Sequence, residues 1–343
     1  MARVLVCAGS RGYIAALQLA LEHEGDITVA AACVTVADAM KLLPRVKPDE
    51  VIIDLEGRAT MGIAAIEDIM GFMPVPILVL TGRPPATDQE AAAVLAAGAL
   101  DVVAKSALDL SVPGGSSADA LRHRVRLLSR ASVIRHPRAK LRSLPPEPRL
   151  DRSASVIGIC GSTGAPLVLA SILAGLPADY PIPILVVQHI SDGFTVGLAR
   201  WLDETVPLPV DVAAGGAPAR AGVHIAPERA HLKLAASGRL YLDRLTGGTR
   251  YRPSGDVLLA SIAEAAGTAS VAVVLSGIGR DGSAGAAAVL GVGGLAIAQD
   301  RHSSAVDGMP QAAVAAGVGL EFSPEEITGC LAELRHRPIA AQG

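Results

Sequence analysis

Three residues of complementary chemistry lie in three separate loops of the second half of the sequence. Ser162 lies in a Gly-Ser-Thr-Gly turn, His189 ends a Val-Val-Gln-His run, and Asp281 lies in a Ser-Gly-Ile-Gly-Arg-Asp-Gly segment. A serine, a histidine and an aspartate can serve as nucleophile, base and orienting acid. Backbone amides near a serine in a sharp turn before a helix can also stabilise an oxyanion. These residue types therefore predict nucleophilic catalysis.

Each candidate follows a short apolar segment that is rich in Val and Ile, which is typical of a buried β-strand. In an open parallel α/β sheet, the carboxyl ends of all strands lie along one edge, where ligands bind. We therefore expect Ser162, His189 and Asp281 to come together on that edge.

The candidates also have simpler interpretations. The serine loop could be only a tight turn, His189 a strand-end histidine with a backbone partner, and Asp281 the N-cap of the helix that follows it. Cys160, which lies just before the serine turn, is a competing nucleophile that we expect to be buried and inert. Three chemically matched residues after three strands favour the catalytic interpretation over three coincidences.

The glycine-rich loop before a helix could instead bind a phosphate. Its spacing, Gly-x-x-Gly-x-x-Gly over residues 158–164, lacks the first close glycine pair of the dinucleotide fingerprint. No acidic residue follows at the usual ribose-binding distance, and no lysine follows as in a P-loop. A dinucleotide-dependent enzyme is therefore disfavoured.

Composition limits the remaining classes. The net charge of -3 and the 2% aromatic content argue against a nucleic-acid partner. No apolar run approaches the roughly 20 residues of a membrane span, and the N-terminal apolar run is too short for a signal peptide. The four cysteines are scattered without metal-ligand spacing. We expect a cytoplasmic protein without membrane insertion, metal or cofactor.

The candidates are positioned by strand and helix patterns that alternate along the chain. This alternation predicts an α/β protein with two doubly wound parallel-sheet domains. The length of 343 residues suggests about two domains. Residues 1–134 form the first, with a last helix at Ala118–Ile134 and a flavodoxin-like topology. Its strands are expected at Val4–Cys7, Ile27–Ala31, Val51–Ile53, Ile77–Thr81 and Asp101–Ala104.

A proline-rich, basic linker is predicted at residues 135–154, because this stretch lacks apolar periodicity. The second, Rossmann-like domain is predicted at residues 155–337, followed by a tail at 338–343. Alternating residues on both sides of a Ser-Gly turn at His231–Asp243 predict an antiparallel hairpin insertion. Ser323, followed by Pro-Glu-Glu, predicts a capped helix start.

The second domain resembles the catalytic domain of the CheB family, the protein-glutamate methylesterases of bacterial chemotaxis. The matching stretches follow the family order over nearly the whole domain: Ile159–Gly164, Val187–His189, His224–Pro227, Arg252–Leu258, Ser276–Gly282 and Ile297–Pro310. A local departure is Ala165, where the family often has a second glycine.

The resemblance implies a catalytic triad of Ser162, His189 and Asp281. It further implies that Thr163, Gly164 and Ile278 support the loop and the oxyanion. The implied activity is hydrolysis of glutamate methyl esters, with glutamine deamidation, on the cytoplasmic helices of methyl-accepting chemoreceptors. Ser162 would attack the ester, His189 would pass its proton to methanol, and Asp281 would fix the imidazole tautomer.

The first domain resembles a response-regulator receiver, which accepts phosphate on an aspartate. That aspartate matches Asp54, and the family's hydroxyl and lysine match Thr81 and Lys105. Ala8-Gly9 replaces the acidic pair that helps to hold Mg²⁺, so we expect Mg²⁺ to bind poorly. Val102 and Ser106 replace the family's aromatic switch and proline, respectively.

We therefore interpret the first domain as a degenerate receiver, with a histidine kinase as a candidate partner and phosphorylation of Asp54 expected to be weak. An alternative role for Asp54, Thr81 and Lys105 is a hydrogen-bonded cluster that joins three strand ends. The alternative function for the whole chain is a signalling or scaffold protein acting outside chemotaxis.

Overall fold

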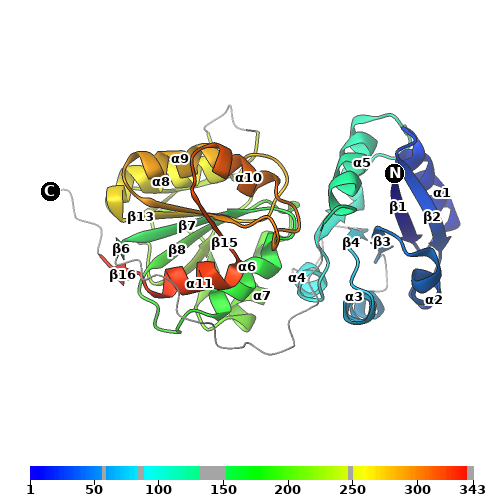
Figure 1. The fold of residues 1–343 in the computed structure, drawn as a ribbon, viewed down its shortest axis with the longest axis horizontal. Helices are drawn as coiled ribbons and strands as arrows, with labels where there is room; N and C mark the ends of the chain where they lie inside the picture. The colour runs from blue at the N-terminus through cyan, green and yellow to red at the C-terminus, as the bar shows by residue number, and fades with distance from the viewer. Residues whose placement is uncertain (56–58, 83–88, 132–151, 246–249, 338–343) are drawn as a thin grey trace. The chain divides into compact units, whose positions relative to one another are not determined.

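The computed structural model describes residues 1–55, 59–82, 89–131, 152–245 and 250–337 (Figure 1). The chain divides into two compact units, Met1–Leu141 and Arg142–Gly343. Each unit has its own parallel sheet, which confirms the predicted α/β class with two parallel-sheet domains. Within these ranges, no helix combines the length and apolar character that crossing a membrane requires.

The sheet of the first unit has the strand order β2-β1-β3-β4-β5, and all its pairings are parallel. This order is the predicted flavodoxin-like topology. The strands are β1 (Ala2–Cys7), β2 (Ile27–Cys33), β3 (Glu50–Asp54), β4 (Ile77–Thr81) and β5 (Asp101–Ala104). The helices are α1 (Arg11–Glu22), α2 (Val36–Val46), α3 (Ala59–Phe72), α4 (Gln89–Ala96) and α5 (Ser116–Leu128), with a 3-10 turn η1 (Lys105–Ala107).

The last helix of this unit differs from the prediction Ala118–Ile134. It ends at Leu128, its last buried residue, where Ser129 caps it and the next two amides form tighter turns. The predicted residues 132–134 lie outside the described residues. A polar Ser-Arg-Ala sequence offers no apolar face to bury, so the tertiary packing that stabilises a helix stops at Leu128.

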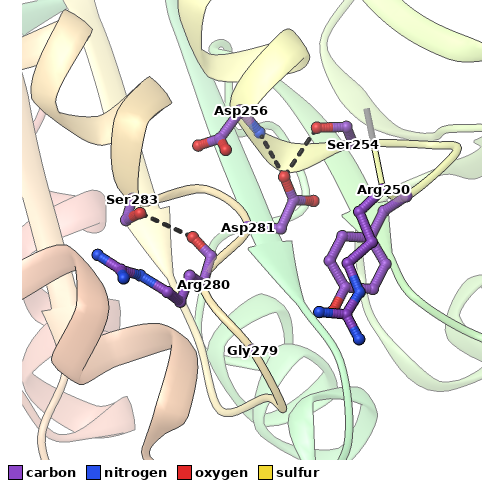
Figure 2. A pocket seen from close by; sticks show the side chains of 8 residues that line it. Arg250, Ser254, Asp256, Gly279, Arg280, Asp281 and Ser283 are labelled. Carbon is purple, nitrogen blue, oxygen red and sulfur yellow. Dashed lines mark hydrogen bonds between the residues drawn. The ribbon is translucent and has the colours of Figure 1, made fainter. Parts of the chain in front are cut away.

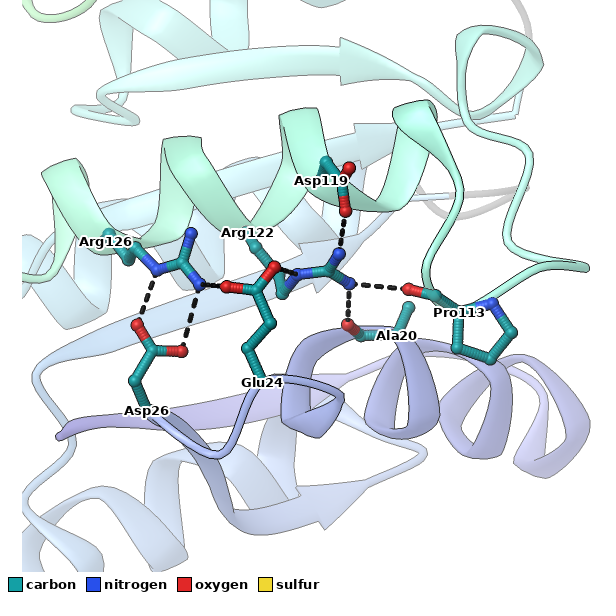
Figure 3. Close-up of polar contacts among 7 residues, drawn as sticks. All are labelled: Ala20, Glu24, Asp26, Pro113, Asp119, Arg122 and Arg126. Atoms are coloured by element: carbon teal, nitrogen blue, oxygen red, sulfur yellow. Dashed lines mark hydrogen bonds and ion pairs between the residues drawn. The ribbon is translucent and has the colours of Figure 1, made fainter.

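A buried arginine joins α5 to the first helix and the loop after it (Figure 3). The Arg122 side chain is fully buried and donates to the carbonyls of Ala20 and Pro113, both at 2.6 Å. It also pairs with Glu24 at 3.2 Å and with Asp119. A buried guanidinium needs several acceptors to offset its lost hydration, and these four acceptors provide them.

The second unit contains a seven-stranded parallel sheet in the order β15-β14-β13-β7-β8-β10-β9. Its strands are β7 (Val156–Gly161), β8 (Pro183–Gln188), β9 (Val210–Val212), β10 (Gly222–Ile225), β13 (Ser270–Val274), β14 (Leu295–Gln299) and β15 (Leu320–Phe322). The helices are α6 (Ala165–Ala174), α7 (Thr195–Thr205), α8 (Gly255–Ala266), α9 (Ser283–Gly291), α10 (Gly308–Ala315) and α11 (Pro324–Ala332), with a 3-10 turn η2 (Gly267–Ala269).

Helices cover both faces of this sheet (Figure 1). Successive residues of β7 alternate between the two cores. Ile157 and Ile159 pack with α6, α7 and α11, whereas Val156 and Cys160 pack with α8, α9 and α10. Burial on both faces explains why these strands read as continuous apolar runs in the sequence.

Two smaller features complete the second unit. The predicted hairpin is confirmed as β11 (His231–Leu234) paired antiparallel with β12 (Leu240–Asp243), and the predicted cap of α11 forms a capping box through Ser323. β6 (Ser153–Ala154) pairs with β16 (Arg335–His336). β6 coincides with the last two residues of the stretch predicted as a linker, residues 135–154.

Candidate active site

The order of the seven strands brings the three catalytic candidates to neighbouring strand ends. β7 lies between β8 and β13, and Ser162, His189 and Asp281 follow β7, β8 and β13, respectively. Backbone hydrogen bonds join the strand ends, since Ser162 N donates to Ser276 O at 3.0 Å and His189 N donates to Gly161 O at 2.9 Å. From β7 the chain first builds the sheet on one side, through β8, β9 and β10, and then on the other side, through β13, β14 and β15. The strand order therefore reverses direction at β7, and parallel sheets bind ligands at such a switch point.

The candidate acid and the candidate base are in direct contact. Nε2 of His189 lies 2.7 Å from Oδ2 of Asp281. Because a carboxylate accepts, Nε2 carries the ring proton and Nδ1 is the basic nitrogen. Nδ1 is buried and has no hydrogen-bond partner among the described residues. The ring of Tyr251 stacks on the imidazole, with centroids 4.5 Å apart, and fixes its plane.

Asp281 accepts hydrogen bonds from four donors. Besides His189, they are the Ser254 hydroxyl at 2.7 Å and the first two amides of α8, Gly255 at 2.6 Å and Asp256 at 3.1 Å. Burial by itself would raise the pKa of the Asp281 carboxyl, but His189 and these donors outweigh burial and lower that pKa. Asp281 is therefore a stable anion that holds the imidazole.

Two aspartates cap each other's helices at this point, and Figure 2 shows the bonds from Ser254 and the Asp256 amide to Asp281. Asp281 precedes α9 and caps α8, while Asp256 begins α8 and accepts from Gly285 N in α9 at 2.9 Å. Burial raises the pKa of Asp256, and the nearby Asp281 charge adds to this shift. Neither Asp256 nor Tyr251 was identified from the sequence, although Asp256 lies in the matching stretch Arg252–Leu258.

The serine turn is fixed by contacts on both sides. Gln188 Nε2 donates to Ser162 O at 2.7 Å, and the Ser276 hydroxyl donates to Thr163 O at 2.8 Å. Gly164 has a φ of +79° as the N-cap of α6, and a Cβ there would lie 2.6 Å from Ala305 Cβ. A glycine at position 164 is therefore required by both backbone conformation and space.

Comparison with known proteins identifies the family. The family model described as CheB methylesterase matches residues 157–331. A protein-glutamate methylesterase/protein-glutamine glutaminase of Anaeromyxobacter dehalogenans is 38% identical, over 97% of this chain and 96% of its own length. The chain belongs to the CheB methylesterase family.

Two further relatives agree. The protein-glutamate methylesterase FrzG of Myxococcus xanthus is 37% identical and covers 94% of this chain and 95% of its own length. The crystal structure of the Thermotoga maritima CheB methylesterase catalytic domain is 38% identical, with a TM-score of 0.51, over 53% of this chain and 98% of that chain. The resemblance stated from the sequence motifs is thus confirmed, and the chain belongs to a family of ester hydrolases.

The residues predicted to support the oxyanion lie around the serine turn of this CheB domain. Thr163 is buried, and Gly164 starts α6. Ile278 lies in the loop after β13, next to Gly277, where a Cβ would come 2.8 Å from Ser162 Cβ. The Ile278 amide makes no backbone hydrogen bond within the described residues. Their role in the reaction stays a prediction.

The competing nucleophile of the CheB domain lies away from the serine. Cys160 is fully buried in the core beneath α8, and its side chain is next to Gly255. Burial, followed by the charges of Asp281 and Asp256, raises the pKa of the thiol well above its usual value. The expectation that Cys160 is buried and inert as a thiol agrees with this environment.

In the first unit, only two of the three residues predicted to form a hydrogen-bonded cluster, Asp54 and Lys105, pair with each other. Lys105 Nζ lies 3.0 Å from Asp54 Oδ2 and 4.1 Å from the centroid of the Tyr13 ring. The Thr81 hydroxyl is buried without a hydrogen-bond partner among the described residues. The three-residue cluster is therefore wrong with respect to Thr81. The described residues also hold no group of three or more His, Cys, Asp or Glu suited to a metal.

Proposed function

We propose that this chain hydrolyses glutamate methyl esters, and deamidates glutamines, on the cytoplasmic helices of chemoreceptors. The observation that carries the proposal is the His189–Asp281 pair, at 2.7 Å, beside the serine turn. The proposed cellular compartment is the cytoplasm. The names of the relatives, which are methylesterases and glutaminases, support the same chemistry.

The proposed reaction has two halves, and His189 moves the proton in both. Ser162 Oγ attacks the ester carbonyl while Nδ1 of His189 takes the hydroxyl proton. The tetrahedral intermediate then expels methanol, which receives that proton. Water, deprotonated by the same nitrogen, cleaves the acyl-enzyme and leaves a glutamate carboxylate and free Ser162. A glutamine follows the same course with ammonia as the leaving group.

Asp281 stabilises the imidazolium that forms in each half. Its four hydrogen bonds keep it ionised, so it need not accept the proton itself. We assign the developing oxyanion to the backbone amides of the serine turn and of Ile278, with Thr163 and Gly164 shaping that turn.

For the first unit, the proposed role is regulation without efficient phosphoryl transfer. The Asp54 carboxylate already faces the ammonium of Lys105 at 3.0 Å. Ala8-Gly9 supplies no carboxylate for Mg²⁺. A histidine kinase remains the candidate partner for this unit.

The test is methanol release from a methylated receptor segment by the full chain. Ser162→Ala should lower the rate by roughly 10³-fold or more, because it removes only the attacking oxygen. Cys160→Ser is the matched control and should keep activity. The reverse pattern would assign the nucleophile to Cys160 and overturn the proposed triad.

A further inference from the structure

A cavity of about 490 Å³ lies on the acid side of the candidate triad (Figure 2). Its lining includes Arg250, Tyr251, Asp256, Arg280, Asp281 and Ser283. Tyr251 belongs both to this lining and to the stack on the imidazole of His189. A molecule that occupies the cavity therefore lies close to the base of the reaction.

The two carboxylates of the cavity are already occupied by other donors. Asp281 accepts from His189, Ser254 and the start of α8, and Asp256 accepts from Gly285. The hydrogen bonds of these carboxylates therefore go to donors other than the arginines, and no ion pair of Arg250 or Arg280 occurs among the described residues. Both arginines are exposed, and Figure 2 shows them on opposite sides of Asp281.

We propose that this cavity binds carboxylate side chains of the substrate helix, with Arg250 and Arg280 as the residues that recognise them. A guanidinium is planar and pairs with a carboxylate through two hydrogen bonds. The inference rests on the proposed function, since the substrate helix is the one that carries the ester. The methyl ester is uncharged, so the recognised carboxylates belong to other residues of that helix. Residues three or four positions apart share a helix face. The recognised acid therefore lies three or four positions from the ester.

The expected effect is on substrate binding. Each arginine would contact the substrate in the ground state and the transition state alike, so its loss raises KM and leaves kcat unchanged. Exposed ion pairs of this type change affinity by about two- to fivefold each. Added salt should reduce the effect, since screening weakens exposed pairs.

The experiment uses two helical peptides that each carry one γ-methyl glutamate. One peptide has Glu three and four positions from the ester, and the other has Gln there. The full chain, the Arg250→Gln/Arg280→Gln double variant and an Arg200→Gln control are compared. Arg200 is an exposed arginine of α7 that does not line the cavity.

We expect the full chain and the Arg200→Gln control to hydrolyse the Glu peptide with the lower KM, and the double variant to treat both peptides alike. Equal KM values for both peptides with the full chain would overturn the carboxylate site alone. A double variant that keeps the preference would do the same. If the full chain hydrolyses neither peptide, the proposed function itself fails and this inference fails with it.

Discussion

Replacing Asp281 by Asn tests the proposed orienting acid without changing the shape of its side chain. The carboxylate accepts from two donors on each oxygen: Ser254 Oγ and Asp256 N on Oδ1, and Gly255 N and His189 Nε2 on Oδ2. An asparagine offers one accepting oxygen and one NH₂ group. Either orientation therefore turns a donor toward a backbone amide at the start of α8.

The size of the effect on stability and on turnover depends on whether the NH₂ group replaces Oδ1 or Oδ2 of the carboxylate. One amide at the start of α8 loses its acceptor in either case, and where that amide is buried the loss costs about 1–3 kcal/mol of unfolding free energy. If the NH₂ group faces His189, it can bond only an unprotonated Nε2. The ring proton then moves to Nδ1, and the base that accepts the serine proton is lost. For comparable triads, this loss lowers kcat by about 10⁴-fold.

The assay pairs methanol release with urea unfolding of the full chain at the same pH. Asp179→Asn is the control, because Asp179 is exposed in the same domain and should leave both measurements unchanged. Turnover close to that of the unmodified chain would refute the assignment of Asp281 as the orienting acid. Loss of stability with full turnover would leave it as a helix cap only.

Two further predictions concern the first unit. Burial, together with Asp101, raises the pKa of Glu50 well above its usual value of 4.5. The protonated side chain therefore contributes its whole stabilisation below pH 4.5, and this contribution is lost as the pH rises through the raised pKa. Glu50→Gln should thus stabilise the chain at pH 8 and much less at pH 4.5 by urea unfolding, and a pH-independent difference would contradict this sign. Small phosphodonors with Mg²⁺ should label Asp54 little and leave the esterase rate unchanged. Stoichiometric acyl-phosphate with a faster rate would restore an ordinary phosphorylation switch.

The sequence was sufficient to predict the parts that depend on local pattern. Short Val- and Ile-rich runs before Ser162, His189 and Asp281 predict strands, and the parallel-sheet rule then places the strand ends on one edge. The geometry of the His189–Asp281 pair agrees with that expectation. The order of the seven strands had no such local signal, because it depends on which strands pair across long separations.

The contacts that the sequence could not predict join distant side chains. Asp256 carries an ordinary helix-start signal, and nothing local indicates that it caps a second helix. Tyr251 precedes that helix and reaches His189 only through the fold. Thr81 matches a familiar motif position, yet its hydroxyl has no hydrogen-bond partner among the described residues, and Lys105 pairs with Asp54.

The position of β13 beside β7 has a consequence for the synthesis of the protein. His189 and Asp281 are 92 positions apart, and the loop that carries Asp281 follows β13. A chain still on the ribosome displays Ser162 and His189 long before Asp281 has been made. Ser254 is the N-cap of α8, and Asp281 accepts from the two amides that follow it, so the loop after β13 completes both the start of α8 and the proposed triad. The proposed triad is therefore complete only after the ribosome has made the chain through the loop that follows β13.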